Sequence, residues 1–363
     1  MIAPPSTGRP FRLIQESSTT RFLGLTVAER NWRVAARCGA RADDAALPTL
    51  SIPARVAITP ALLRSLPTAA GLVHITSPAT ALPIVWAEAG TSPTTPPVRW
   101  PAPEGSVLDV STPSARYTSS WQLLRASGKP TDGWLSRVVH RRISRVFSYL
   151  CLQVGLTANI ATGLTFLLGA AGAWLIAQTT HQTMVWGALL YWASSIADGI
   201  DGEMARLTLS ESAFGEQLDT GVDQATHLLA LTGAGVGWYR QGFAGGWPLA
   251  VAVALGVPLI LLWAMALVRR ARNSTAFFVV TKPIELAIED AARQTRAFPL
   301  RIAAVVFILF RREAFSCSAF VVALLTGQRV IYPILVTISL AIVAATFLFY
   351  RSALNTALRR VLS

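Results

Sequence analysis

The feature that most constrains the fold of this chain is a series of long apolar segments in its second half. They lie at 159–177, 184–197, 224–238, 246–268, 314–326 and 330–350. Several approach the roughly 20 residues that an α-helix needs to cross a bilayer core. The chain is 52% hydrophobic and 14% charged, whereas ordinary soluble domains carry about 25% charge. We therefore expect an all-α bundle of six transmembrane helices behind a soluble N-terminal part.

The basic residues indicate which ends of these segments face the cytoplasm. The formal net charge is +13, and most Lys and Arg after residue 135 cluster at 137–145, 269–272, 282–312 and 351–360. Because cytoplasmic loops carry the excess of basic residues, we expect a multi-pass protein of the cell membrane with both termini cytoplasmic. The clusters flank apolar spans and contact anionic headgroups in this interpretation. No zinc spacing or basic recognition helix is present, so no nucleic-acid partner is expected.

The first third of the chain predicts a separate domain. Residues 1–10 are expected to form a disordered tail and 11–115 a small cytoplasmic α/β domain. The short apolar stretches RVAI and GLVHI favour strands, whereas GLTVAERNWRVAARCGA (24–40) favours a helix. The helical spacing is that of Ala28, Trp32, Ala35 and Ala36.

Two connecting segments follow. The Pro-rich stretch TSPTTPPVRWPAPEG (91–105) predicts a loop or linker. Residues 116–156 are expected to hold a linker and a juxtamembrane helix. Within them, DGWLSRVVHRRISRVFSYLC (132–151) alternates apolar and basic residues as a helix lying in the membrane interface does. His140 falls inside this segment.

Residues 157–363 form the expected membrane domain. Thr157 is a candidate cap for its first helix. The predicted spans are roughly 159–177, 184–207, 214–238, 246–269, 311–327 and 330–350. The second and third spans reach full length only because each includes part of the stretch DGIDGEMARLTLSESAFGEQLDTGVD (198–223).

Four aspartates in this stretch, the motif aspartates, form two helical stripes. They are Asp198, Asp201, Asp219 and Asp223. The first two are three residues apart and share a face of the second span, whereas the last two are four apart and share a face of the third. The turn 207–214 makes the spans antiparallel. With a rise of 1.5 Å per residue, Asp198 and Asp223 both lie about 12 Å from that turn. The four carboxylates are therefore expected to converge at one depth.

Carboxylates gathered in low dielectric repel each other and are costly to desolvate. A divalent cation removes this cost, and all-oxygen ligation favours Mg²⁺, Mn²⁺ or Ca²⁺ over zinc. Because the set holds no His or Cys, we expect Mg²⁺ or Mn²⁺. We expect a close pair of ions, with places left for water and substrate phosphates. Two alternatives for the four aspartates are a structural role, as polar residues that hold helices together, and a transport role, as a carboxylate-lined pathway of a cation transporter. His227, one turn after Asp223, is expected to pack inside the bundle.

The spacing D198-x-x-D201-G202-x-x-A205-R206-(x8)-G215-x-x-x-D219-x-x-x-D223 resembles the motif of the CDP-alcohol phosphotransferase (CDP-alcohol phosphatidyltransferase) family at every fixed position. The resemblance covers roughly residues 129–350. Relatives often have Thr-Pro-Asn where this chain has Thr157-Ala158-Asn159, so the proline is absent but the amide is kept. Such proteins transfer a phosphoryl group from a CDP-linked donor to an alcohol, with release of CMP.

The resemblance implies roles for individual residues. Asp198, Asp201 and Asp219 would hold the metals and the CDP diphosphate, and Asp223 would complete the metal site and act as general base. The other CDP-binding positions would be Asn159, Gly202, Ala205, Arg206 and Gly215. Family members are usually homodimers, and a homodimer is therefore expected here.

The junction Lys129-Pro130-Thr131-Asp132-Gly133-Trp134 is similar to that of members with an N-terminal nucleotidyltransferase-like domain, such as di-myo-inositol phosphate phosphate synthases. The Gly-rich nucleotide loop is absent, and the domain has roughly half the usual length. We expect a degenerate, non-catalytic domain that serves as a cap or docking module, with an unrelated α/β domain as the alternative.

The acceptor and the donor stay open at this point. An acceptor phosphate would need cations, for which Lys282, Arg269, Arg312 and Arg351 at the cytoplasmic mouth are candidates. The donor is CDP-diacylglycerol or a CDP-polyol, and the pathway phospholipid or polar-headgroup synthesis. A cation transporter and a catalytically inactive scaffold are the alternatives to this enzyme.

Overall fold

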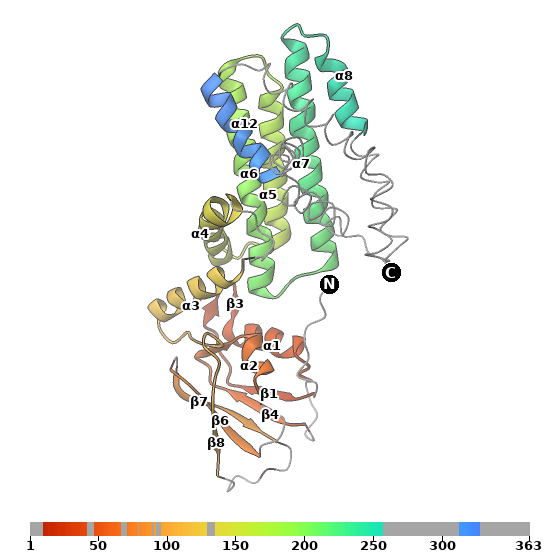
Figure 1. Cartoon of the computed structure of the whole chain (residues 1–363). Coiled ribbons are helices and arrows are strands. Elements are labelled where there is room, and N and C mark those ends of the chain that lie inside the picture. Colours follow the sequence, from red (N-terminus) through yellow and green to blue (C-terminus); the bar gives the residue numbers. More distant parts are fainter. Residues whose placement is uncertain are drawn as a thin grey trace, which may run out of the picture. The chain divides into compact units, whose positions relative to one another are not determined.

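A computed structural model describes residues 10–41, 47–66, 71–78, 80–88, 91, 96–128, 135–256 and 312–326. The chain divides into two compact units (Figure 1). The first comprises the described residues of 1–131, 145–157 and 202–211. The second comprises those of 132–144, 158–201 and 212–363.

The first unit is built on a five-stranded mixed sheet in the order β1-β4-β7-β6-β8. The strands are β1 (Arg12–Gln15), β4 (Thr49–Ile52), β7 (Thr80–Ala87), β6 (Leu72–Ser77) and β8 (Val98–Pro101). The outer pairs β1–β4 and β6–β8 are parallel, and the inner pairs are antiparallel. The expected α/β region with a sheet is therefore confirmed, and the GLVHI stretch forms most of β6.

Two small antiparallel pairs complete the strands. β2 (Arg21–Phe22) and β3 (Leu25–Thr26) form a hairpin whose two turn residues, Leu23 and Gly24, both have positive φ, as tight hairpin turns require. β5 (Val56–Ile58) pairs with β9 (Val107–Asp109). The RVAI stretch thus contributes a strand, as expected.

Helices α1 (Val27–Arg37) and α2 (Pro60–Arg64) pack on the sheet. α1 begins where the Thr26 hydroxyl accepts a hydrogen bond from the Glu29 N–H, 3.1 Å away, which satisfies one of the donors that a helix start leaves open. Val34 and Ala35 enter the hydrophobic core with Leu50 and Ile75. The helix is confirmed, but Trp32 and Ala36 of the expected apolar spacing are exposed.

Two of the connecting segments contain regular structure that the sequence did not predict. β8 lies inside the Pro-rich stretch that was expected to be a loop. As the edge strand of its sheet it needs hydrogen bonds on one side only, so Pro101 is tolerated at its end. Residues of the expected linker form α3 (Pro113–Ala126), which starts with proline in its first turn behind the N-cap Thr112.

The second unit is helical. Its described elements are η1 (Ser136–His140), the start of α4 (Arg141–Gln153), α5 (Ala158–Ile176), most of α6 (His181–Thr208), α7 (Ala213–Arg240), α8 (Gly246–Val251), η2 (Ala252–Gly256) and α12 (Arg312–Thr326). Helices α5, α6, α7 and α12 agree with four expected spans to within three residues at each end. The expected span 330–350 and the end of 246–269 lie outside the described residues.

Small residues let these helices pack backbone to backbone. A Cβ on Gly172 of α5 would lie 2.8 Å from the Tyr191 nitrogen of α6. A Cβ on Gly233 of α7 would lie 2.5 Å from the Ala173 oxygen of α5. Both distances are too short for a real side chain, so glycine is required at each contact. Close contacts of this kind are typical of helices that pack inside membranes.

Within the described residues, one helix, α5, is long and apolar enough to cross a membrane by length and composition. α6 and α7 each have 28 residues, about 42 Å at 1.5 Å per residue. Their length exceeds the roughly 30 Å of a bilayer core, but the charged motif lowers their apolar content. The count of six spans is therefore a prediction that this structure leaves open.

Candidate active site

The motif aspartates lie on two consecutive helices joined by a short turn. α6 ends at Thr208, and α7 begins at Ala213 (Figure 1). Ser212 is the N-cap of α7, and its hydroxyl accepts a hydrogen bond from the Gly215 N–H at 3.0 Å. This cap fixes the start of α7, and with it the positions of the aspartates two and three turns further on.

Asp201 is the most buried motif aspartate, with 5% of its surface exposed. Its carboxylate accepts a hydrogen bond from the hydroxyl of Thr162 on α5. Asp198, Asp219 and Asp223 are half-buried. A buried carboxylate is costly unless it is hydrogen-bonded, so Thr162 explains how Asp201 is accommodated at this position.

Asn159 also lies beside the motif. A Cβ on Gly215 would be 3.7 Å from the Asn159 side-chain oxygen, so the amide of α5 borders the small residue of α7. Asn159 and Thr162 are three residues apart and share one face of α5. One turn of α5 therefore places its amide beside Gly215 of α7 and its hydroxyl on Asp201 of α6.

Further along α6, Arg206 folds back over the small residue of the preceding turn. A Cβ on Gly202 would be 3.1 Å from the Arg206 Nη1 atom. Gly202 and Ala205 are half-buried. The guanidinium therefore occupies the space that a larger side chain at Gly202 would fill.

The donors suit a hard cation, because all four are carboxylates. Within the part of the chain that the structure describes, however, no three His, Cys, Asp or Glu side chains are gathered as a metal ion would require. The expected convergence of all four carboxylates is therefore not seen as a closed cluster. The metal site stays a prediction.

Three contacts near the motif were missed by sequence reasoning, those of Arg141, Glu203 and Thr162. Arg141 is 7% exposed, and its Nη1 atom donates to the Gly199 carbonyl oxygen at 3.4 Å. It was expected to face headgroups with the other arginines of its segment, and that expectation was wrong for this residue. Glu203 is fully buried and accepts from the Ser148 hydroxyl at 2.7 Å. Thr162 could have been found, since it follows Asn159 at helical spacing.

The structure also places other residues that the sequence analysis singled out. His227 packs inside the bundle as predicted, with its Nδ1 atom 2.6 Å from the Tyr191 hydroxyl. His140 is buried, and its Nε2 atom accepts from the Trp192 indole at 3.3 Å. Arg312 is the first residue of α12. The acceptor candidates Arg269, Lys282 and Arg351 lie outside the described residues.

The motif on its two helices, with the contacts from α5, indicates a helical transferase. Comparison with known families supports this class. The family model described as CDP-alcohol phosphatidyltransferase matches residues 155–359. This is more than half of the chain, and the chain belongs to this family. The resemblance seen in the motif is confirmed.

Curated relatives share the name "Bifunctional IPC transferase and DIPP synthase". This chain is 40% identical over 117 residues to the one from Thermococcus kodakarensis, covering 32% of this chain and 26% of the relative. It is 35% identical over 119 residues to that of Aquifex aeolicus, covering 32% and 26%. It is 33% identical over 181 residues to that of Rubrobacter xylanophilus, covering 50% and 41%. The matches thus span from about a quarter to two fifths of these relatives' length.

Proposed function

We propose that this chain is a metal-dependent transferase that moves a substituted phosphoryl group from a CDP-linked donor to an alcohol, with release of CMP. One observation carries the proposal. The complete family motif lies on α6 and α7, with the α5 residues Asn159 and Thr162 beside it. Family membership supports the reaction class.

The donor would bind along the small-residue stripe. Gly202, Ala205 and Gly215 are the small motif positions proposed to line the cytidine pocket, with the Arg206 guanidinium beside Gly202 and the Asn159 amide beside Gly215. Arg206 supplies a guanidinium for the nucleotide or the diphosphate, to which its planar fork is suited. Asp198 and Asp201 present carboxylates for a metal-bound diphosphate.

The reaction needs one bond formed and one broken. The acceptor oxygen attacks the phosphorus farther from the cytidine, and the bond from that phosphorus to the bridging oxygen breaks to leave CMP. The hydroxyl proton passes to the carboxylate of Asp223, acting as general base. Phosphoryl transfer depends mainly on positioning and charge neutralisation, which the motif helices supply.

The proposed cofactor is a pair of Mg²⁺ or Mn²⁺ ions held by the motif aspartates. When bound, they would neutralise the charge of the diphosphate. The all-carboxylate donor set supports this choice. The protein's own part is to hold Asp201 through Thr162 and to keep Asp223 placed to accept the proton.

We propose two alternative classes of donor substrate. The relatives' names include "DIPP synthase", which favours a CDP-inositol type of donor. The interfacial segment around α4, with exposed Val146, Phe147 and Leu150, favours a lipid donor such as CDP-diacylglycerol. The acceptor is an alcohol, and Lys282, Arg269, Arg312 and Arg351 are the proposed ligands for any phosphate that it carries.

The proposed setting is the cell membrane, with six spans, cytoplasmic termini and a site that opens to the cytoplasm. The apolar length of α5 and the close glycine packing of α5, α6 and α7 support a membrane location, and the proposed orientation rests on the positions of the basic clusters. A homodimer is proposed on the resemblance to family members. The N-terminal domain is proposed to be a non-catalytic, nucleotidyltransferase-like cap.

The test is CMP release by the purified full chain in detergent, with Mg²⁺ or Mn²⁺. CDP-inositol and CDP-diacylglycerol are offered as donors against a panel of alcohols. Asp223→Asn should abolish release, whereas Glu216→Gln, which removes an exposed carboxylate from the same helix, should leave it intact. Absence of both CMP release and cytidine-nucleotide binding in the wild type would reject the enzyme and favour a transport role.

A further inference from the structure

The C-terminal end of α6 has an unusual set of partners for its last four carbonyl groups. The N–H of Ser210 donates to the Ala205 carbonyl at 2.9 Å, and that of Leu209 to the Arg206 carbonyl at 3.4 Å. Leu209 has φ 55°. These features define a Schellman motif, with leucine at the left-handed position that glycine usually takes. The motif serves two of the four carbonyls and leaves those of Leu207 and Thr208.

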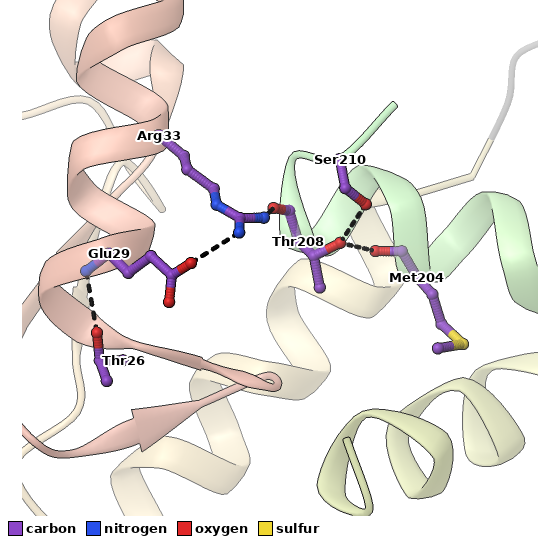
Figure 2. A network of polar contacts seen from close by, with 6 residues as sticks. All are labelled: Thr26, Glu29, Arg33, Met204, Thr208 and Ser210. Carbon is purple, nitrogen blue, oxygen red and sulfur yellow. Dashed lines mark hydrogen bonds and ion pairs between the residues drawn. The ribbon is translucent and has the colours of Figure 1, made fainter. Parts of the chain in front are cut away.

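The two remaining carbonyls accept from arginines of the N-terminal domain. The Nη1 atom of Arg30 donates to the Leu207 oxygen. The Nη1 atom of Arg33 donates to the Thr208 oxygen at 2.7 Å. Figure 2 shows Arg33 between Glu29 of its own helix and Thr208. Every one of the last four carbonyls of α6 is thereby satisfied, half of them by α1.

A third arginine extends the same face of α1 to the turn after α6. Arg37 forms a 2.7 Å ion pair with Glu211. Arg30, Arg33 and Arg37 are spaced three and four apart, so they share one helical face. Positive side chains at a helix C-terminus also complement its dipole. α1 therefore contacts residues 207, 208 and 211 with three successive cations.

An apolar contact accompanies these polar ones. Leu209 packs against the hydrophobic core of the N-terminal domain, whose members include Leu62 and Ile75. Arg30 is itself 4% exposed, and its guanidinium lies over the Phe22 ring, 5.5 Å from the centroid. A buried charge is costly unless it is hydrogen-bonded. The buried Arg30 guanidinium therefore depends on the carbonyl that accepts its hydrogen bond.

We propose that Arg30 and Arg33 are positioning residues for the transferase, and that α1 fixes the end of the motif helix. Arg206 and Gly202 lie within the last two turns of α6, directly before the fixed carbonyls. When the end of α6 frays, these two residues leave the geometry that the donor nucleotide requires. The N-terminal domain thus supports donor binding by holding the end of α6, and it needs no nucleotide chemistry of its own for this role. This inference rests on the proposed function.

The test uses the full chain in detergent micelles and begins with Arg33→Ala. Amide hydrogen exchange at Leu209 and Ser210 should become about tenfold faster, a factor that corresponds to about 1.4 kcal/mol. The donor KM for CMP release should rise with kcat almost unchanged, because only the closed end of α6 binds the donor; the factor equals the loss of closed population, not the gain in exchange rate. Arg33→Lys keeps one charged donor and should restore both values most of the way.

The matched control is Arg64→Ala, which removes an exposed arginine from α2 of the same domain. It should change neither exchange nor KM. A charge reversal tests the same contact without shortening a side chain to alanine. Arg37→Glu and Glu211→Arg should each speed exchange at Ser210, and the double variant should recover it.

The outcomes separate this inference from the proposed function. Equal exchange in Arg33→Ala and Arg64→Ala would overturn the inference. Faster exchange with an unchanged donor KM would leave a purely structural contact and would also overturn it. An inactive wild type would reject the proposed function, and the exchange measurements would still decide whether α1 holds the end of α6.

Discussion

At the scale of single residues, several buried charged side chains in the described part of the chain have a specific hydrogen-bond partner. Asp201 accepts from Thr162, Glu203 from Ser148, and Arg30 donates to Leu207. Burial lowers the pKa of Arg30 to about 10, so its guanidinium is still protonated at neutral pH and can donate. Each buried charge here joins residues that are far apart in the sequence.

Thr162 gives the sharpest prediction at this scale. Thr162→Val keeps the shape of the side chain but removes the hydroxyl that donates to Asp201. Loss of the group that orients a metal-ligating carboxylate typically weakens metal affinity by about tenfold or more, so metal and donor binding should weaken by about that factor. Titrating CMP release with Mg²⁺ measures the change. Thr162→Ser should behave as wild type, and equal titrations for the valine and wild-type proteins would contradict the role of this hydrogen bond.

At the scale of elements, α5 is the helix that α6 and α7 both contact. It carries Thr162 and Asn159 near its start and the backbone contacts of Gly172 and Ala173 nearer its end. The spacing between these groups sets how α6 and α7 approach α5. A substitution that forces α5 away from α6 should therefore also displace the α5 residues that lie at the candidate site.

Two glycines of α5 provide a matched pair for testing this packing. Gly172→Ala places a Cβ within 2.8 Å of the Tyr191 backbone, and forced overpacking costs about 1–3 kcal/mol. Gly163→Ala meets nothing within 4 Å and should stabilise the helix by up to about 1 kcal/mol. Thermal unfolding in detergent should show a lower midpoint for the first variant and an equal or higher one for the second. Equal losses in both would refute the close packing.

The sequence predicted these elements well where their signals are local. Apolar runs located α5, α6, α7 and α12, and the aspartate spacing located the candidate site. Local signals failed for β8, because an edge strand tolerates the prolines that otherwise indicate a loop. They also failed for Arg141, because a basic amphipathic pattern does not reveal which arginine turns inward.

At the scale of the whole molecule, the compact units do not follow the order of the chain. Residues 202–211 belong with the N-terminal domain, although 177 positions separate Arg30 from Leu207. No pattern in the sequence pairs them. Leu209 pays about 1–2 kcal/mol for its left-handed backbone, and burying a leucine side chain contributes about 1.5–3 kcal/mol when complete. Leu209 is partly buried, so its contact with the core offsets part of the cost of the strained turn, and the turn depends on that contact.

This dependence predicts that a substitution at residue 209 loosens a domain that begins two hundred residues earlier. Cys38 is 2% exposed in the same core, and burial raises the pKa of its thiol, so it should react slowly with a thiol reagent because the thiolate is the reactive form. In a Cys151→Ser, Cys317→Ser background, Leu209→Ala should speed labelling of Cys38 about tenfold, since local opening limits access. Leu164→Ala, which truncates an exposed leucine of α5, should not. Unchanged labelling in Leu209→Ala would mean that the N-terminal core is complete without residue 209, and that the domain and the motif helix are stable independently of each other.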